Sequence, residues 1–511
     1  MTIELSRRTL VKALGIGAAS AQFILRSGIV LAADEDLITI GWPSDVPSWD
    51  PEQRTVPDAQ PIYKMVFDQP LDQAPDLKLI PKLVKAWNQA PDALSLTLDF
   101  RDDVTFHDGS KMTADDFRYS FFGRVKAGHK IDVANIWGTV TDIEVTSPTH
   151  AIMHFKSPNP TASVWLAFLC SFVVPKAYME KVGVDEFVKK PIGTGPYKLA
   201  DYELNSRIVL ERNDSYWGPK PTIKRVTFQI IKDPSARVAA IQSGQVDITL
   251  NVPVREAERF AKEPGFKGEL VPITRVIILQ PRGDLGFADK NVRLAAHHAI
   301  DKKALSKSFY GGAAVPLSVA ATPGSPGYVE DYTFPYDVDL AKKLLADSGF
   351  STAKPAKIKM ATTNGQFPSD YDIARAIVQM WKKVGIDAEI DVIEYDKYFE
   401  LNRGNKLPEV TLYSWDNATG DPEIYIGYLL NPHLPFSAWK EKEIGDEIAA
   451  LFSVADYDKR IAAYKEINKK AVEYGAMIPL LQSVLTVARK STVDYTHYEN
   501  GWILADTIKK T

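Results

Sequence analysis

Residues 415–422 hold the densest set of side chains that could bind a small organic molecule, in the order Trp-Asp-Asn-Ala-Thr-Gly-Asp-Pro. Trp415 offers a flat apolar face, and Asn417 offers an amide that both donates and accepts hydrogen bonds. Asp416 and Asp421 add carboxylates that could pair with a cationic group. Binding sites for organic ligands combine aromatic faces with a few polar groups in this way, so this segment is the first candidate for a ligand site.

The motifs of common catalytic and metal centres are absent from the sequence. It has no Gly-x-Ser-x-Gly, no His-Glu-x-x-His and no Gly-x-x-x-x-Gly-Lys, and its eight histidines are scattered. His107 follows a strand and has no ligand-type neighbours, which indicates a structural role. His297 and His298 are adjacent on a predicted helix, so their rings point about 100° apart, and we expect both to be solvated. We expect no catalytic residue, no metal site and no cofactor; a secreted enzyme with two carboxylates in a cleft is an alternative that the sequence leaves open.

Alternating strands and helices precede this segment. The pattern of apolar residues predicts a helix begun by Asp337 or Asp339 and ended by Gly349, a strand at 358–362, a helix begun by a capping box of Ser369 and Asp372, a strand at 388–392, a helix at 396–403 and a strand at 410–415. Such alternation implies a parallel sheet, and ligands bind at the carboxyl ends of the strands in such sheets. The sequence therefore predicts an α/β fold that places residues 415–422 at such an end.

A second organised stretch lies at residues 191–250. It begins with Pro-Ile-Gly-Thr-Gly-Pro, where the glycines allow a tight loop, and continues through an Asn-Asp-Ser-Tyr-Trp-Gly-Pro turn at 213–219. The remainder predicts a strand-helix-strand unit, with a strand at 226–230, a helix that runs from Asp233-Pro234 to Ser243-Gly244, and a strand at 246–250.

Both stretches resemble the extracytoplasmic solute-binding proteins of family 5, as do residues 83–87, 94–101 and 104–117, where Thr113 and Asp116 form a capping box. That family delivers peptides, nickel chelates and other solutes to ABC importers. The resemblance implies a two-lobed, periplasmic-binding-protein-like α/β fold (type II, cluster C-like) with a two-strand hinge and an extra subdomain in the first lobe. It also implies that the lobes close over a ligand.

The resemblance further implies where the domains begin and end. The first lobe would comprise residues 34–275 and 480–511, with the extra subdomain at about 72–190, and the second lobe would comprise residues 276–479. The chain has 511 residues, and one hydrophobic core rarely serves so long a chain. The two crossings between the lobes would lie at 275–280 and 477–482.

Residues 1–33 have the pattern of an export signal. Arg7 and Arg8 precede a short apolar run at 13–25 that is rich in Gly and Ala and is broken by Arg26, and we expect cleavage near Ala32 or Ala33. This pattern predicts a twin-arginine signal peptide that is removed, and a protein located in the periplasm. The run is too short to favour a membrane anchor.

Charge and cysteine content set further bounds. The chain has 61 basic and 65 acidic residues and a net charge of -4, which gives no electrostatic reason to expect nucleic acid as a partner. Cys170 is the only cysteine, so no disulfide can form within the chain, and we expect it to pack in the apolar run around it. We expect a monomer.

Four more candidate site residues follow from the resemblance. Trp42 and Asp45 lie in a loop that borders the cleft in the family. Peptide-binding members carry an Asp at the position of Ala418, where it pairs with the peptide's ammonium, and dipeptide-binding members carry an Arg near the position of Asn364. Because both anchors are missing, an ordinary free dipeptide is disfavoured.

The ligand class stays open. Asp416 or Asp421 could replace the missing carboxylate and hold a longer peptide or an amino-acid conjugate. A nickel or other metal chelate is an alternative, because His433 lies one residue from the histidine of nickel-chelate members. The side chains that would suit an opine or a glycoside are Trp42, Tyr413, Trp415 and Asn417.

The partners expected from the resemblance are a small-molecule ligand and the permease subunits of an ABC importer in the inner membrane. The signal pattern at residues 1–33 adds the twin-arginine export machinery. A sensor or chaperone role on the same fold is a further alternative, which a missing importer would favour.

Overall fold

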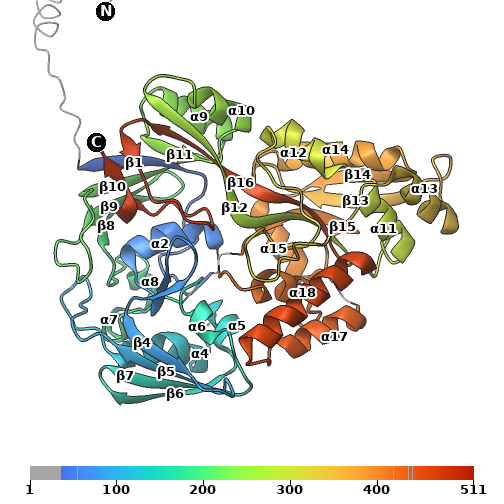
Figure 1. Ribbon diagram of the computed structural model, residues 1–511. Coiled ribbons are helices and arrows are strands. Elements are labelled where there is room, and N and C mark those ends of the chain that lie inside the picture. The colour runs from blue at the N-terminus through green and yellow to red at the C-terminus, as the bar shows by residue number, and fades with distance from the viewer. Residues whose placement is uncertain are drawn as a thin grey trace, which may run out of the picture.

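The computed structural model describes residues 36–511 except Thr55, Lys130, Cys170, Ala418, Pro435, Phe436 and Lys440. The predicted signal peptide at residues 1–33 and the predicted packing of Cys170 therefore lie outside the described residues. Figure 1 shows two bodies joined by two long strands that run from one body into the other. Within the described part, no helix combines the length and the apolar character needed to cross a membrane.

A ten-stranded sheet extends through both bodies, in the order β14-β13-β15-β12-β16-β11-β1-β10-β9-β8. Its strands are β1 (Leu37–Trp42), β8 (Tyr197–Glu203), β9 (Arg207–Arg212), β10 (Arg225–Ile230), β11 (Ile248–Leu250), β12 (Phe266–Pro281), β13 (Ala356–Thr362), β14 (Ile386–Val392), β15 (Val410–Trp415) and β16 (Ile478–Lys490).

β12 and β16 are the long strands that connect the two bodies (Figure 1). They pair with each other in antiparallel fashion, and their register shifts between Pro272 and Val276. In the first body β16 also pairs with β11, where Arg489 lies opposite Ile248. In the second body β12 also pairs with β15, where Val276 lies opposite Trp415. Each strand thus belongs to both lobes, as a two-strand hinge requires; the exact lobe boundaries, which fall in these strands, remain predictions.

The first lobe contains the predicted strand-helix-strand unit. β10 leads into α9 (Pro234–Gln242) and then β11, and β1 pairs in parallel with both strands. The Asp233 carboxylate accepts a hydrogen bond from the N–H of Ala236 and caps the helix. Gly244 follows the helix with a φ of 79°, a left-handed conformation that suits glycine at a helix end.

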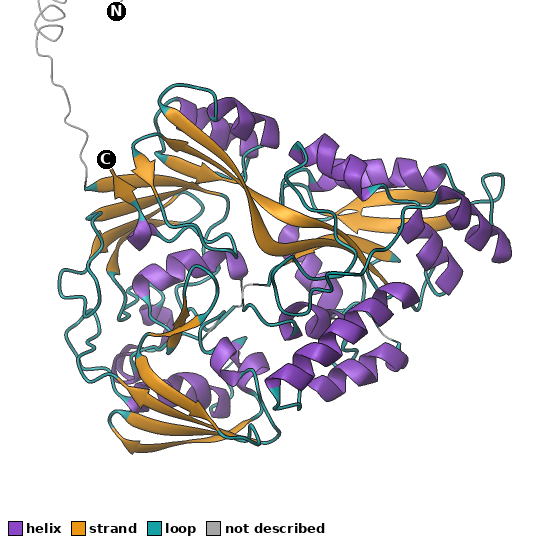
Figure 2. Cartoon of the chain, viewed as in Figure 1, coloured by secondary structure: helices purple, strands orange, loops and turns teal. Residues whose placement is uncertain are grey.

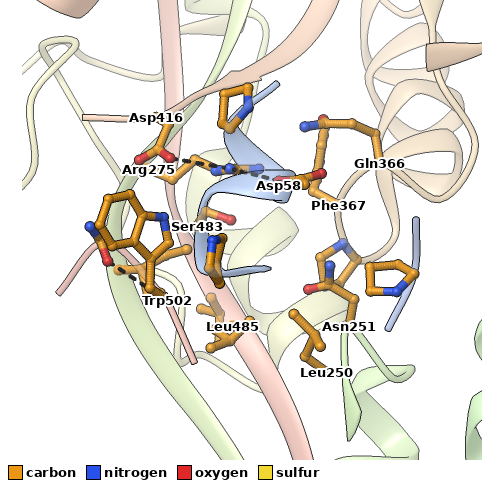
Figure 3. A pocket seen from close by; sticks show the side chains of 18 of the residues that line it. Asp58, Leu250, Asn251, Arg275, Gln366, Phe367, Asp416, Ser483, Leu485 and Trp502 are labelled. Carbon is orange, nitrogen blue, oxygen red and sulfur yellow. Dashed lines mark hydrogen bonds and ion pairs between the residues drawn. The ribbon is translucent and has the colours of Figure 1, made fainter. Parts of the chain in front are cut away.

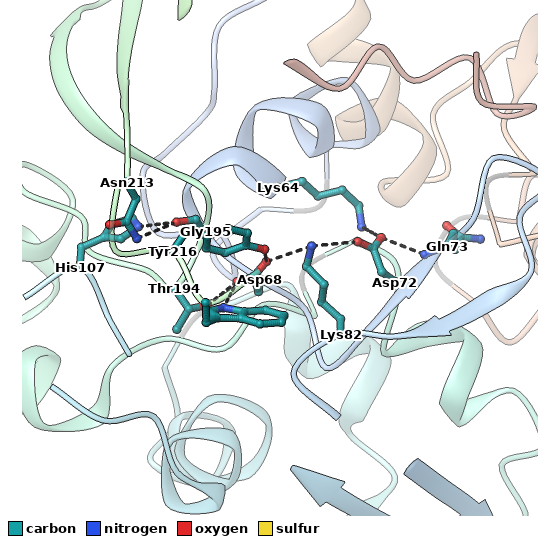
Figure 4. A network of polar contacts seen from close by, with 11 residues as sticks. Lys64, Asp68, Asp72, Gln73, Lys82, His107, Thr194, Gly195, Asn213 and Tyr216 are labelled. Carbon is teal, nitrogen blue, oxygen red and sulfur yellow. Dashed lines mark hydrogen bonds and ion pairs between the residues drawn. The ribbon is translucent and has the colours of Figure 1, made fainter. Parts of the chain in front are cut away.

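The Gly-Thr-Gly loop packs directly on the end of α2 (Gln60–Val66). A Cβ atom on Gly195 would lie 2.6 Å from backbone atoms of this helix, so a side chain does not fit there. Thr194 Oγ1 donates to the buried carboxylate of Asp68 at 2.9 Å, and Trp217 Nε1 donates to the same carboxylate at 3.2 Å (Figure 4). Asp68 therefore fastens both the loop and the turn that carries Trp217.

His107 has the structural role that the sequence predicted. Its Nδ1 accepts a hydrogen bond of 3.2 Å from the N–H of Gly193. Its Nε2 lies 3.0 Å from the carbonyl oxygen of Gly195, as Figure 4 shows. Burial lowers the pKa of His107 to about 4, so the ring is neutral at physiological pH. A neutral ring with its proton on Nε2 satisfies both contacts and holds the loop closed.

A separate antiparallel sheet has the order β4-β5-β7-β6 and falls within the predicted extra subdomain at 72–190. α3 (Ala114–Arg118) begins with the predicted capping box, since the Thr113 N–H donates to the Asp116 carboxylate at 2.9 Å. The strands of this sheet are β4 (Val84–Gln89), β5 (Ser95–Phe100), β6 (Val140–Ser147) and β7 (His150–Phe155).

The second lobe alternates strands and helices as predicted. β13 pairs in parallel with β14 and with β15, and helices lie on both faces of these strands (Figure 2). The helices are α11 (Lys290–His298), α12 (Lys302–Tyr310), α13 (Val338–Asp347), α14 (Asp370–Lys382), α15 (Tyr395–Arg403), α16 (Tyr428–Leu430), α17 (Lys442–Leu451) and α18 (Tyr457–Tyr474).

The predicted capping box of Ser369 and Asp372 is wrong. Ser369 has a φ of 65° and its side chain makes no capping bond. Asp370 acts instead, because its carboxylate accepts hydrogen bonds from the N–H groups of Gly365 and Gln366 in the preceding loop. The start of α14 is therefore held from the loop before it rather than from within its own first turn.

The prediction that His297 and His298 are solvated is also wrong. His297 is 1% exposed, and its ring stacks on Phe334 with centroids 3.6 Å apart. His298 stacks on the same ring at 4.4 Å. Phe334 lies in a later loop, so the residues next to His297 and His298 in the sequence did not indicate that these rings would be buried.

Candidate ligand-binding cleft

A narrow pocket lies where the two lobes meet along β12 and β16 (Figure 3). Its free volume is about 50 Å³, which is room for a few water molecules. Segments of both lobes line it, including the ends of β1 and β11, the loop after β13 and the segment after β15. The lining side chains that carry polar groups or large aromatic faces include Trp42, Asn251, Arg275, Gln366, Asp416 and Trp502.

Arg275 on β12 lies between carboxylates from the two lobes (Figure 3). Its Nη2 is 3.4 Å from Asp416 Oδ2 in the second lobe and 3.7 Å from Asp58 Oδ1 in the first lobe. Burial raises the pKa of Asp416, while the charge of Arg275 opposes that shift. These charged residues give the pocket two acidic groups and one basic group, a balance that favours a ligand with a cationic or hydrogen-bond-donating group.

Several buried polar atoms in and beside this pocket have no hydrogen-bond partner in the part of the chain that the structure describes. Buried polar groups in proteins nearly always have a partner, so these atoms are candidates to bind a ligand or water. They are Trp42 Nε1, Gln366 Oε1, Trp415 Nε1, Asp416 Oδ1, Asn417 Oδ1 and Nδ2, and Asn500 Nδ2.

The predicted aromatic residues of the second lobe form one packed group. Tyr413 stacks on Tyr398 with centroids 4.0 Å apart and planes 8° apart, so one face of its ring is covered by protein. Trp415 meets Tyr413 edge to face at 6.1 Å. Tyr413 therefore supports Trp415, which leads directly into Asp416 at the pocket.

Two predicted carboxylates are held by other parts of the protein. Both oxygens of Asp421 accept hydrogen bonds of 2.7 Å from Arg460. Asp45 Oδ2 accepts from Tyr202 Oη at 3.0 Å and from the N–H of Asn205 at 2.6 Å, and Asp45 is not among the residues that line the pocket. Both carboxylates thus have structural partners that a ligand would have to displace.

The remaining two predicted site residues are Asn364 and Ala418. Asn364 is exposed in the loop after β13, two residues before Gln366, which lines the pocket. Ala418 lies outside the described residues.

Sequence reasoning missed Arg275 and Trp502 as site residues. Arg275 is the one charged residue at the start of the apolar stretch 275–280, and a lone charge on a buried strand is a signal that could have identified it. Trp502 stacks on Phe168 of the first lobe at 6.2 Å, a contact that brings together distant parts of the chain. Nothing near Trp502 in the sequence indicated its position.

The candidate for metal binding lies on the surface. His433 is 64% exposed, and its Nε2 lies 3.5 Å from Asp446 Oδ1. Among the described residues, no group of three or more His, Cys, Asp or Glu side chains is placed to hold a metal ion.

Comparison with known proteins identifies relatives across most of the chain. Residues 78–433 match the family described as bacterial extracellular solute-binding proteins, family 5 Middle. The nickel-binding periplasmic protein of Escherichia coli K12 is 27% identical over 500 residues, which cover 91% of this chain and 92% of that protein. The dipeptide-binding protein of the same strain is 26% identical and covers 83% of this chain and 86% of its own length.

The fold is that of solved two-lobed binding proteins. The periplasmic binding protein DppA of Helicobacter pylori, solved with the peptide STSA, superimposes with a TM-score of 0.83 at 22% identity. The match covers 93% of this chain and 98% of that chain. The expected two-lobed α/β architecture is therefore confirmed.

Proposed function

Because this chain belongs to the bacterial extracellular solute-binding proteins of family 5, we propose that it captures one small organic solute between its lobes and delivers it to an ABC importer. The observation that carries this proposal is the set of unpartnered buried polar atoms where the lobes meet. A binding protein needs such atoms, because they gain their hydrogen bonds only when the ligand is enclosed.

Capture requires the lobes to separate and close again. Pockets for organic ligands typically hold roughly 300–1,000 Å³, whereas this pocket offers about 50 Å³. The pocket of the described conformation is therefore too small for such a ligand, which can be accommodated only when the lobes move apart. The register shift in β12 between Pro272 and Val276 is where the paired strands can bend with the least loss of hydrogen bonds.

The charged groups favour a ligand that carries a positively charged or strongly donating group. Asp416 has one oxygen, Oδ1, without a partner among the described residues, whereas Arg460 holds both oxygens of Asp421. Peptide-binding members carry an aspartate at the position of Ala418, and it pairs with the ammonium group of the peptide. Asp416 is therefore the better candidate to make that contact in this chain. Arg275 is placed to bind an acidic group on the same ligand.

The ligand class that fits these groups is a peptide or amino-acid conjugate, an opine, or a glycoside with a charged substituent. Trp42 and Trp502 supply flat faces on the first-lobe side, and Trp415 lies beside Asp416 on the other side. Asn417 can donate and accept at once, as amide and sugar groups require.

A nickel or metal chelate is the second candidate. The nickel-binding periplasmic protein of Escherichia coli covers more of this chain than the dipeptide-binding protein does. A chelate that supplied all its own metal ligands would need no protein histidine, and Arg275 could bind its carboxylates.

Export and location complete the proposal. Residues 1–33 would direct the folded chain through the twin-arginine route and be removed, which leaves a monomeric protein in the periplasm. Mass spectrometry of the purified exported protein would test this: the expected mature chain begins near Asp34, and a chain that retains residues 1–33 would contradict the proposal.

Native mass spectrometry of freshly purified protein tests the function. We expect one small molecule bound per chain and a higher melting temperature when the released molecule is added back. If peptides, opines, sugars and nickel chelates neither bind nor raise the melting temperature, the proposal is wrong. If a bound solute is chemically changed on incubation, the secreted-enzyme alternative is favoured.

A further inference from the structure

A second contact between the lobes, separate from the pocket, is made by Glu423. This residue begins η3 (Glu423–Gly427) in the second lobe and is 4% exposed. Its Oε1 accepts a hydrogen bond of 2.9 Å from Thr161 Oγ1 and one of 3.4 Å from Trp165 Nε1. Both donors lie at α6 (Ala162–Trp165), within the extra subdomain of the first lobe.

In the described conformation, Thr161 and Trp165 of the first lobe cover the Glu423 carboxylate. The ring of Trp165 also packs against Tyr428 of α16, with centroids 5.5 Å apart. When the lobes separate, this tryptophan and Thr161 leave together, and water reaches the carboxylate. A carboxylate that has protein partners in one conformation and water in the other is a two-state element.

We propose that Glu423 is a latch between the lobes, which binds Thr161 and Trp165 on closing and takes up a proton as it does so. The inference rests on the proposed lobe closure but not on any ligand. Glu423 then affects how strongly the lobes close and at which pH closure is favoured, but it does not contact the solute.

The groups around Glu423 explain why its carboxylate binds a proton when the lobes are closed. Within the second lobe it faces the Asp421 carboxylate, the Arg460 guanidinium and the hydroxyls of Tyr464 and Tyr428. From the described residues of the first lobe, the two neutral donors face Glu423. Burial, and next the charge of Asp421, raise the pKa of Glu423 to about 7, while Arg460 and the two donors oppose the shift.

The difference in the pKa of Glu423 between the open and closed forms determines whether a lower pH favours or opposes lobe closure. In the open form Glu423 would be more hydrated, while Asp421 and Arg460 of the same lobe stay beside it, so its pKa should lie below the value of about 7 in the closed form. The closed form therefore holds more protons near and below pH 7, so closure becomes more favourable as the pH falls through that range. The proton belongs on Oε2, the oxygen that receives no hydrogen bond from the described residues. One proton changes the ratio of closed to open molecules by at most about tenfold per pH unit.

Distance measurements between spin labels on the two lobes test the latch without a ligand. Labels would replace Lys181 on the first lobe and Lys442 on the second, both exposed, in a background with Cys170→Ser. We expect the closed fraction of the ligand-free protein to rise from pH 7.5 to pH 5.5. Glu423→Gln, which is neutral at every pH, should remove this dependence and stay as closed as the wild type at the lower pH.

A second variant separates the latch from general loss of folding. Thr161→Val combined with Trp165→Phe should lower the closed fraction at both pH values and leave the pH dependence in place, because the carboxylate remains. Circular dichroism melting would show that each variant is folded. The proposal is overturned if the wild type shows the same distances at both pH values, or if Glu423→Gln keeps the wild-type dependence. Either result would leave the proposed solute binding untouched.

Discussion

Replacing Arg460 with Met should destabilise the protein, because it would leave Asp421 charged, buried and without its partner. The two side chains are 2% and 7% exposed, and two hydrogen bonds of 2.7 Å join them. Breaking a buried pair by removal of one partner typically costs about 3–5 kcal/mol. We expect the free energy of unfolding, measured by urea denaturation followed by tryptophan fluorescence, to fall by about that amount.

Two control variants show whether the pair has this structural role. Arg259→Met on α10 (Val254–Phe260) removes a guanidinium that is 38% exposed and pairs with Glu256 and Glu263 near the surface, so it should cost roughly 0–1 kcal/mol. Asp421→Asn added to Arg460→Met should recover part of the stability, since it removes the buried charge. The reasoning is refuted if Arg460→Met costs less than about 1 kcal/mol, and a loss of solute binding at unchanged stability would assign Asp421 to the ligand.

Three further variants test other parts of the molecule. Asp416→Asn should lower the affinity for the co-purified solute by at least about tenfold, because a hydrogen bond to a charged group is worth roughly 1.5–3 kcal/mol; isothermal titration calorimetry measures this, and unchanged affinity would remove Asp416 from the site. Gly195→Ala should lower the free energy of unfolding by about 1–3 kcal/mol, because its Cβ would lie 2.6 Å from the backbone of α2. Its control, Gly123→Ala, places the new Cβ 3.5 Å from its nearest neighbour and should be neutral or stabilising; equal losses would contradict the steric argument. Burial lowers the pKa of His297 well below its ordinary 6.5, so the unfolded chain binds a proton that the folded chain excludes, and stability falls as the pH drops below 6.5. His297→Phe should reduce this fall when urea midpoints at pH 7.5 and pH 5.0 are compared, and an unreduced fall would show that other groups cause it.

Local signals predicted the elements whose ends depend on adjacent residues. Asp233 caps α9 as its position before Pro234 indicated, and Thr113 and Asp116 form the expected capping box. In each case the partners lie within one helical turn of each other. The family resemblance then supplied the two-lobed arrangement, which the local signals could not give.

The errors and omissions came from contacts made outside the helix or strand that was being predicted. Ser369 carries a good capping side chain, but the loop that Asp370 holds fixes a backbone conformation in which Ser369 cannot cap. His297 is covered by a phenylalanine from a later loop. A sequence shows which residues can make a contact, whereas the competition between possible partners is decided only in the folded chain.

The sequence predicted some residues of the candidate cleft and missed others. Asp416 directly follows β15, so its place at the edge of the sheet follows from the strand pattern, whereas Trp42, the last residue of β1, was indicated by the family resemblance. Arg275 and Trp502 reach the pocket from a connecting strand and from the C-terminal segment. Their positions depend on how β12 and β16 cross from one lobe to the other.

The place of β16 in the sheet has a consequence for how the chain folds during its synthesis. This strand is the last of the ten to leave the ribosome, yet it lies between β12 and β11, in the middle of the order. Until residues 478–490 emerge, neither lobe can complete its hydrogen-bonded ladder, and the apolar edges of both stay open to aggregation. The nascent polypeptide therefore has to be kept from self-association until nearly all of it has been translated, and a cell that makes it should depend on holding chaperones for its yield.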